Sequence, residues 1–172
     1  LVLARMFQRY CHSNWAAILL TATASFGTLV LPFSKTFNNH TPAFVSAVLA
    51  VQAVVMIAVE GRRHWGWFAA AGFFAAFVCC NELPAAAFGL ISFLWLAKLD
   101  LRKTLIVYVP FAIVPLAAFI YTNFEVTGGL KPFYMYYATE KYNYVESGVP
   151  SYWVNPKGID QAKDDPATYL FH

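Results

Sequence analysis

Charged side chains are scarce in this chain of 172 residues, and their scarcity argues against an ordinary soluble domain. Aspartate, glutamate, lysine and arginine make up 12% of the sequence, against roughly 25% in ordinary soluble domains. Hydrophobic residues reach 59%, and the mean hydropathy is +0.52. The formal net charge of +3 is small, so no nucleic-acid partner is expected. The composition favours a membrane protein.

The sequence also lacks the short motifs of the common soluble enzymes. It contains no HExxH, GxSxG, Walker or EF-hand pattern, and no pair of cysteines spaced as CxxC. We interpret Cys11, Cys79 and Cys80 as small apolar residues, because neighbouring cysteines do not easily form a disulfide with each other. No cofactor is predicted, and the need for a divalent cation stays open.

Long apolar runs take the place of these motifs. They cover residues 15–33, 42–59, 65–80, 85–97 and 104–121. A perpendicular membrane helix needs about 20 apolar residues, so the third and fourth runs predict either tilted helices or a re-entrant hairpin. The expected fold class is all-α, a polytopic transmembrane bundle of about five membrane-embedded helices. The alternative is a soluble bundle of five buried helices, which requires apolar side chains on every face of each run.

Basic residues occupy every second gap between the runs, which predicts one orientation in a membrane. These basic residues are Arg5, Arg9, Arg62, Arg63, Lys98, Arg102 and Lys103. By the positive-inside rule, the N-terminus and the basic loops are cytoplasmic. Residues 38–40, residues 81–82 and everything after residue 121 are then expected on the outer face. Glu60 is predicted to pair with the adjacent arginines.

The chain divides into two regions of different composition. Residues 1–121 are the predicted transmembrane helical region, and residues 122–172 are a predicted extracytoplasmic aromatic-rich loop region. Turn-forming residues leave only residues 131–144 of the second region capable of a helix. That segment is either an amphipathic helix on the membrane surface or an ordinary loop with aromatic anchors. In the first region, Pro110 and Pro115 predict a kinked last helix. We interpret the whole chain as a piece of a longer membrane protein.

Polar residues at the outer ends of the runs are candidates for a binding site. Asn38, Asn39 and His40 offer two amides and an imidazole to a phosphate or a sugar hydroxyl. The alternative is a loop that caps the next helix, with Thr41 as its N-cap before Pro42.

Glu82 is the more specific candidate for a functional residue, because placing a carboxylate between two apolar runs is costly in a membrane. It is predicted to hold a cation or a substrate amine, or to act as a base. The alternative is a charge in the headgroup layer between two helices. Lys131 and Tyr134 follow the fifth run, and their convergence with Glu82 and His40 is a hypothesis.

Two segments resemble the middle of the polytopic bacterial GT-C glycosyltransferases, which include enzymes similar to protein mannosyltransferases and aminoarabinose transferases. One is the helix opening Asn-His-Thr-Pro-Ala at residues 39–43, and the other is the hairpin at residues 73–89, with Asn-Glu-Leu-Pro at its centre. The resemblance implies a protein of the bacterial inner membrane whose partners are membrane lipid and a polyprenyl-phosphate sugar. It also implies sugar transfer at the outer face. The family's acidic first outer loop would lie upstream of Leu1.

Two other functions stay open. The first is a transporter or permease, in which the broken hairpin at Glu82 and Pro84 lines a substrate path. The second is a non-catalytic membrane scaffold whose aromatic tail binds another protein or the lipid surface.

Overall fold

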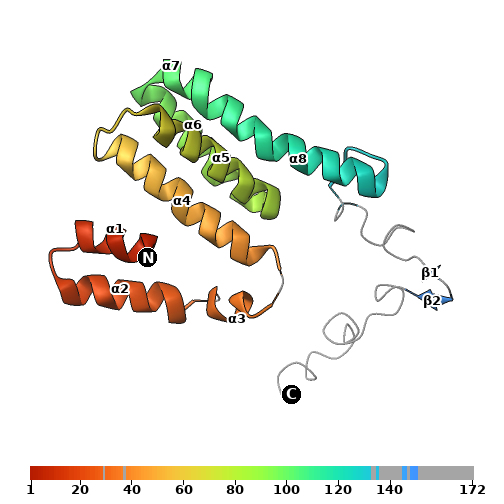
Figure 1. Cartoon of the computed structure of the whole chain (residues 1–172), viewed down its shortest axis with the longest axis horizontal. Helices are drawn as coiled ribbons and strands as arrows, with labels where there is room; N and C mark the ends of the chain where they lie inside the picture. Colours follow the sequence, from red (N-terminus) through yellow and green to blue (C-terminus); the bar gives the residue numbers. More distant parts are fainter. Residues whose placement is uncertain (29, 37, 133–134, 136–144, 147, 151–172) are drawn as a thin grey trace. The chain divides into compact units, whose positions relative to one another are not determined.

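The computed structural model describes residues 1–28, 30–36, 38–132, 135, 145–146 and 148–150, most of which are helical (Figure 1). The chain forms two compact units, residues 1–119 and residues 120–172. The helical elements are α1 (Val2–Tyr10), α2 (Asn14–Phe26), α3 (Val30–Ser34), α4 (His40–Ala58), α5 (Trp65–Asn81), the 3₁₀ turn η1 (Leu83–Ala85), α6 (Ala86–Leu99), α7 (Leu101–Lys103), the π-helical η2 (Thr104–Tyr108) and α8 (Val109–Thr127). In the second unit, β1 (Val145–Glu146) pairs antiparallel with β2 (Val149–Pro150). Most of the tail helix predicted for residues 131–144 lies outside the described residues.

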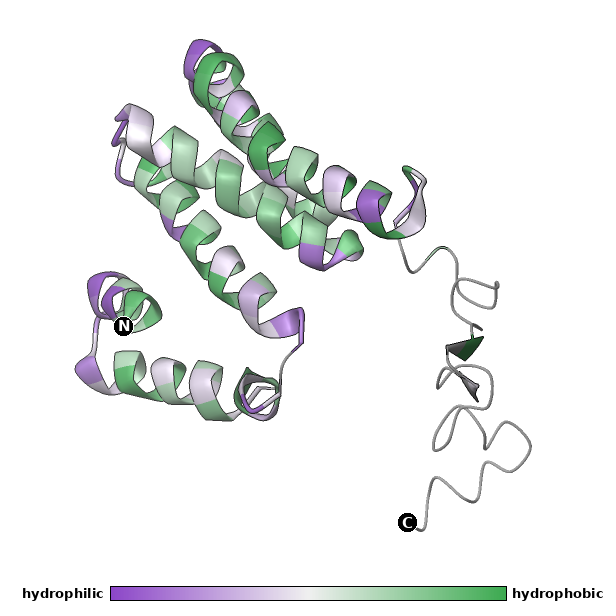
Figure 2. Cartoon of the chain, turned by 45° about the vertical axis from the view of Figure 1, so that its right-hand side comes forward, coloured by the Kyte–Doolittle hydropathy of each residue, from purple (hydrophilic) through white to green (hydrophobic). Residues whose placement is uncertain are grey.

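Two helices are long and apolar enough to cross a membrane. They are α4, with 19 residues, and the continuous helix Leu101–Thr127, with 27 residues. α5 and the helix Leu83–Leu99 are apolar but shorter. Figure 2 shows hydrophobic residues along these helices and hydrophilic residues at their ends. The predicted helical class is confirmed, whereas five membrane-embedded helices stay a prediction.

The first apolar run, residues 15–33, is not the single helix that hydropathy predicted. α2 ends at Phe26, and the N–H of Gly27 closes its last turn on the Thr23 carbonyl at 2.8 Å. The five-residue α3 begins separately at Val30. Glycine is favoured at helix ends because fixing its backbone inside a helix costs more entropy. α1 is a further difference, since the sequence indicated only a basic segment there.

Small residues form the core of the first unit. Ala50 and Ala53 of α4 and Ala71 and Ala75 of α5 are fully buried. They let the backbones of the two antiparallel helices approach closely, as small residues do in membrane proteins. The larger buried side chains that pack around them are Ile57, Phe68, Leu96, Val107 and Tyr108.

The closest approach in this core lies between α5 and η2. A Cβ atom added to Gly72 would lie 2.8 Å from the Tyr108 carbonyl carbon and closer still to its oxygen. The Tyr108 hydroxyl donates to the Gly89 carbonyl at 3.2 Å, so this one residue contacts both α5 and α6. Only glycine fits at position 72 without a movement of backbone.

The last helix, which the sequence predicted to be kinked by Pro110 and Pro115, contains a π-helical turn just before Pro110, and the kink itself stays a prediction. The Val109 N–H donates to the Thr104 carbonyl, five residues earlier. Pro110 has no N–H, and its ring would clash with a carbonyl four residues before it in a regular α-helix. A π turn directly before the proline changes that alignment. Pro115 lies inside α8.

We expect Gly72→Ala to destabilise the first unit, because the new methyl group meets backbone atoms of Tyr108. Overpacking of this kind typically costs about 1–3 kcal/mol. Thermal unfolding of the purified chain in detergent measures the effect. Gly89→Ala is the matched control, since its Cβ would meet the Cys79 sulfur at 3.1 Å and the Ala75 carbonyl oxygen at an ordinary contact distance of 3.9 Å. Equal stability of the two variants would contradict the close backbone contact.

Candidate functional site

The beginning of α4 is fixed by Asn38. Its side-chain oxygen accepts hydrogen bonds from the N–H groups of His40 at 3.0 Å and Thr41 at 3.3 Å. Its amide nitrogen donates to the Phe33 carbonyl at 2.9 Å. The predicted N-cap role of Thr41 is therefore wrong, because the Asn38 side chain satisfies the first free N–H groups of the helix. The Thr41 hydroxyl donates instead to Phe33, at 3.0 Å.

The end of α5 presents a carboxylate at the turn between two apolar helices. Glu82 has an extended backbone, with φ −136° and ψ 99°, and directly follows the last residue of α5. Its carbonyl accepts the Ala85 N–H at 2.9 Å, within the η1 turn that contains Pro84. The Asn81 side-chain amide donates a hydrogen bond to the Phe77 carbonyl at 2.8 Å. The turn thus holds Glu82 at the edge of the helical unit.

The structure brings together three of the predicted site residues, Asn39, His40 and Glu82. The Asn39 amide donates to the Glu82 Oε1 at 3.0 Å and to the Asn81 carbonyl at 2.7 Å. The His40 Nδ1 forms an ion-pair contact with the same Glu82 oxygen. The side chains of His40 and Glu82 are 45% and 33% exposed, so the pair remains accessible. We call Asn39, His40 and Glu82 the outer cluster.

The hydrogen bonds of the outer cluster do not involve the Nε2 of His40. Asn39 has two amide hydrogens, and the two acceptors use both of them. When the His40 Nδ1 donates to Glu82, its Nε2 is left free to act on a ligand. The Phe33 ring lies 4.5 Å from the imidazole ring, centre to centre, and supports it from one side. Asn39 and Glu82 therefore position His40, and His40 is the group available for binding.

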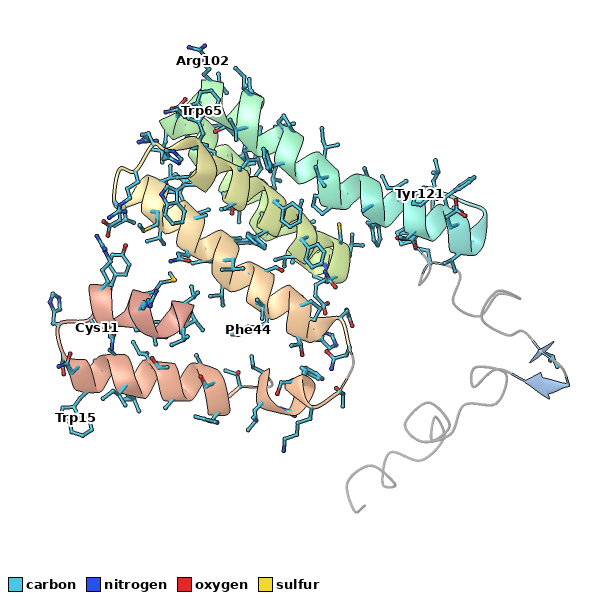
Figure 3. All side chains as sticks on the ribbon, viewed as in Figure 1. Cys11, Trp15, Phe44, Trp65, Arg102 and Tyr121 are labelled. Atoms are coloured by element: carbon cyan, nitrogen blue, oxygen red, sulfur yellow. The ribbon has the colours of Figure 1, made fainter. Side chains whose placement is uncertain are left out.

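An apolar pocket adjoins the imidazole. It has a volume of about 450 Å³ and is lined by Thr28, Val30, Phe33, His40, Thr41 and Phe44. Figure 3 labels Phe44 on α4. Three aliphatic or aromatic residues and two threonines surround this space, while the imidazole supplies its ionisable group. The pocket is suited to a molecule that is apolar along most of its length and polar at one end.

The other predicted site residues have different places. Asn38 is not part of the outer cluster, and its side chain accepts the first N–H groups of α4 as described above. Lys131 is exposed in the second unit. Tyr134 lies outside the described residues, so its convergence with Glu82 stays a prediction, as does that of Lys131. No group of three or more His, Cys, Asp or Glu side chains gathers as a metal site in the described part of the chain.

A second ionic contact was missed by the sequence analysis. Glu60 was predicted to pair with the adjacent arginines, but it binds α1 instead. The Arg9 Nε donates to Glu60 at 2.6 Å, and the Tyr10 hydroxyl donates to it at 2.8 Å. The two partners are some 50 residues away in sequence, and no local spacing indicates the contact. Together the Arg9 guanidinium and the Tyr10 hydroxyl hold the pKa of the Glu60 carboxyl below its ordinary value.

Comparison of this chain with family models, with curated proteins and with solved structures finds no match in any of the three.

We expect the contact between α1 and the end of α4 to weaken in acid. The pKa of Glu60 is lowered in the folded chain. Its contribution to stability is therefore fully present above the ordinary pKa of a glutamate and is lost as the pH falls through the lowered value. Thermal unfolding of the wild type and of Glu60→Gln should differ at neutral pH and converge in acid. A stability difference that persists unchanged at low pH would contradict this assignment.

Proposed function

We propose that this chain is part of an integral membrane glycosyltransferase of the GT-C type, which transfers sugar from a polyprenyl-phosphate donor at the outer membrane face. In this proposal five helical segments are embedded in the bacterial inner membrane, with the N-terminus and the basic loops in the cytoplasm. Two helices of sufficient length and apolarity support the membrane location. The hairpin at residues 73–89 carries the resemblance to the family.

The observation that carries the proposal is the outer cluster beside an apolar pocket. A polyprenyl-phosphate sugar combines an anionic head with a long hydrocarbon chain. The imidazole of His40 suits the phosphate, and the pocket lined by Phe33 and Phe44 suits the adjoining part of the chain. Glu82 holds the imidazole in place through its contact with Nδ1. The Nε2 of His40 is the atom that we assign to the phosphate.

The reaction assigns His40 an electrostatic role. An acceptor oxygen forms a bond to the anomeric carbon while the bond from that carbon to the phosphate oxygen breaks. The electron pair leaves with the polyprenyl phosphate, and the acceptor proton goes to a carboxylate that acts as the general base. A fixed hydrogen-bond donor at the departing phosphate lowers the barrier because negative charge develops there. Asn39 and Glu82 contribute by holding the imidazole in place.

We expect His40→Ala to reduce sugar transfer by about 10²-fold or more, which is the usual cost of removing one such donor. Glu82→Gln should cause a smaller loss, because the imidazole remains but loses the carboxylate that holds its Nδ1. The assay follows transfer of labelled hexose from polyprenyl-phosphate hexose by the full-length protein in membrane vesicles. His12→Ala is the matched control, since His12 is exposed and lies before α2. Wild-type transfer by His40→Ala would overturn the role of the outer cluster.

A transporter is the second candidate, and the broken helices favour it. The chain is interrupted between α2 and α3 and again at η1, and Thr28 and Val30, at the first break, line the pocket beside His40. Transporter sites are commonly built from such discontinuous helices. Uptake of a free sugar by proteoliposomes, with no transfer from the lipid-linked donor, would favour this function over the glycosyltransferase.

The proposed orientation of the chain in the membrane can be tested separately. Lys35 directly follows α3, four residues before Asn39, and is exposed, and Arg102 is exposed at the opposite end of the helices. We expect an impermeant maleimide to label Lys35→Cys, but not Arg102→Cys, in intact cells. The variants are made in a chain whose three cysteines have been replaced by alanine. Labelling of Arg102→Cys alone would reverse the proposed orientation.

A further inference from the structure

The boundary between α1 and α4 contains a small cavity, which we call the basic cavity. α1 packs against both α2 and α4 (Figure 1). The basic cavity has a volume of about 180 Å³. Met6, Val55 and Met56 form its apolar wall, and its polar groups come from Arg5, Arg9, Tyr10 and Gln52. Pockets for whole drug-sized ligands usually measure about 300–1,000 Å³, so this cavity accepts one small polar group.

Two of these four polar side chains already have a partner. The Arg9 Nε donates to the Glu60 Oε1 at 2.6 Å, and the Tyr10 hydroxyl donates to the same oxygen at 2.8 Å. Arg5 and Gln52 differ, because neither side chain forms a hydrogen bond or an ion pair with another described residue. Arg5 is exposed and Gln52 is partly exposed, so a ligand can reach both. The uncompensated charge at the basic cavity is therefore that of Arg5.

Gln52 is an unusual residue for its position in α4. Between Ser46 and the end of the helix at Ala58, all the other residues are apolar, and α4 is long and apolar enough to cross a membrane. A polar side chain in such a helix is costly unless it forms hydrogen bonds. The amide of Gln52 offers both donors and an acceptor. A group bound by Arg5 in the same cavity would supply the missing partner.

A second cavity lies along the same two helices and is apolar. It has a volume of about 290 Å³ and is lined from α4 by Phe44, Val45, Val48 and Leu49, and at α1 by residues 1–4. The α4 residues of the basic cavity follow about two helical turns later. The apolar cavity is therefore nearer the middle of α4, and the basic cavity is nearer its end. A phospholipid in one leaflet of a membrane has its acyl chains and its headgroup in this same order.

We propose that the two cavities between α1 and α4 bind one anionic phospholipid, with its phosphate at Arg5 and Gln52 and part of an acyl chain in the apolar cavity. The Arg5 guanidinium donates charge-assisted hydrogen bonds to phosphate oxygens, and the Gln52 amide donates to a further oxygen of the headgroup. The one uncompensated charge of Arg5 matches the single negative charge of phosphatidylglycerol. This site does not include the outer cluster and does not depend on glycosyl transfer.

Binding is measured on the purified full chain in a neutral detergent by native mass spectrometry. The added molecules, at equal concentration, are phosphatidylglycerol, phosphatidylcholine and glycerol 3-phosphate, which has no acyl chain. We expect phosphatidylglycerol to bind more tightly than the other two. Arg5→Gln should weaken its binding about tenfold or more, as expected for a lost charge-assisted hydrogen bond, and Gln52→Leu about fivefold. Equal binding of glycerol 3-phosphate would overturn the lipid as the source of the phosphate, and equal binding of phosphatidylcholine would overturn the selection of an anion.

Arg102→Gln is the matched control, because it removes the same charge from an exposed arginine outside the basic cavity. It should retain wild-type binding, and a loss equal to that of Arg5→Gln would mean a diffuse basic surface. His40→Ala should also retain binding, since a loss there would place the lipid at the outer cluster. Either loss would overturn the proposal. If Arg5→Gln does not fold, Gln52→Leu decides, because leucine is compatible with an apolar helix, and undiminished binding by Gln52→Leu would overturn the site.

Discussion

Contact between alanine-lined backbones holds α4 against α5, and the positions of both helix ends depend on it. At about 1.5 Å per residue, the 19 residues of α4 and the 17 residues of α5 have similar lengths. Because the two helices are antiparallel and tightly packed through Ala50, Ala53, Ala71 and Ala75, the beginning of one lies beside the end of the other. This pairing brings Asn39 and His40 to Glu82, although they are more than 40 residues apart in sequence.

The π turn extends this packing to the last helix. A π turn contains one more residue than an α turn, so it rotates the residues after it by about 100° relative to a regular helix. The turn ends at Tyr108, which is buried in the core, where its carbonyl lies close to Gly72 and its hydroxyl donates to the Gly89 carbonyl. Thr104 begins the turn with its hydroxyl bound to the Asp100 carbonyl at 2.8 Å. The irregularity that Pro110 requires thus becomes a specific contact with two other helices.

The sequence predicts α4, α5 and α6 well, because each is a continuous apolar run bounded by polar or turn residues. It predicts the break at Gly27 poorly, since hydropathy averages across a single glycine. Asn39, His40 and Glu82 are recognisable because polar groups are conspicuous between apolar runs. The hydrogen-bonding roles of these three residues cannot be recognised from the sequence, because they depend on how α4 is aligned along α5. The contact between Arg9 and Glu60 has no local signal at all.

A carboxylate at the turn between two apolar helices is unfavourable unless other groups satisfy its charge. The Glu82 Oε1 is bound by the Asn39 amide and the His40 imidazole at the beginning of α4. The site and the helix packing are therefore coupled. A shift of α4 along α5 by one turn would move both donors by about 5.4 Å, and the carboxylate would lose both of its partners. The same coupling orients the imidazole. An outer cluster held by helix register presents His40 in one direction, which a flexible loop would not do.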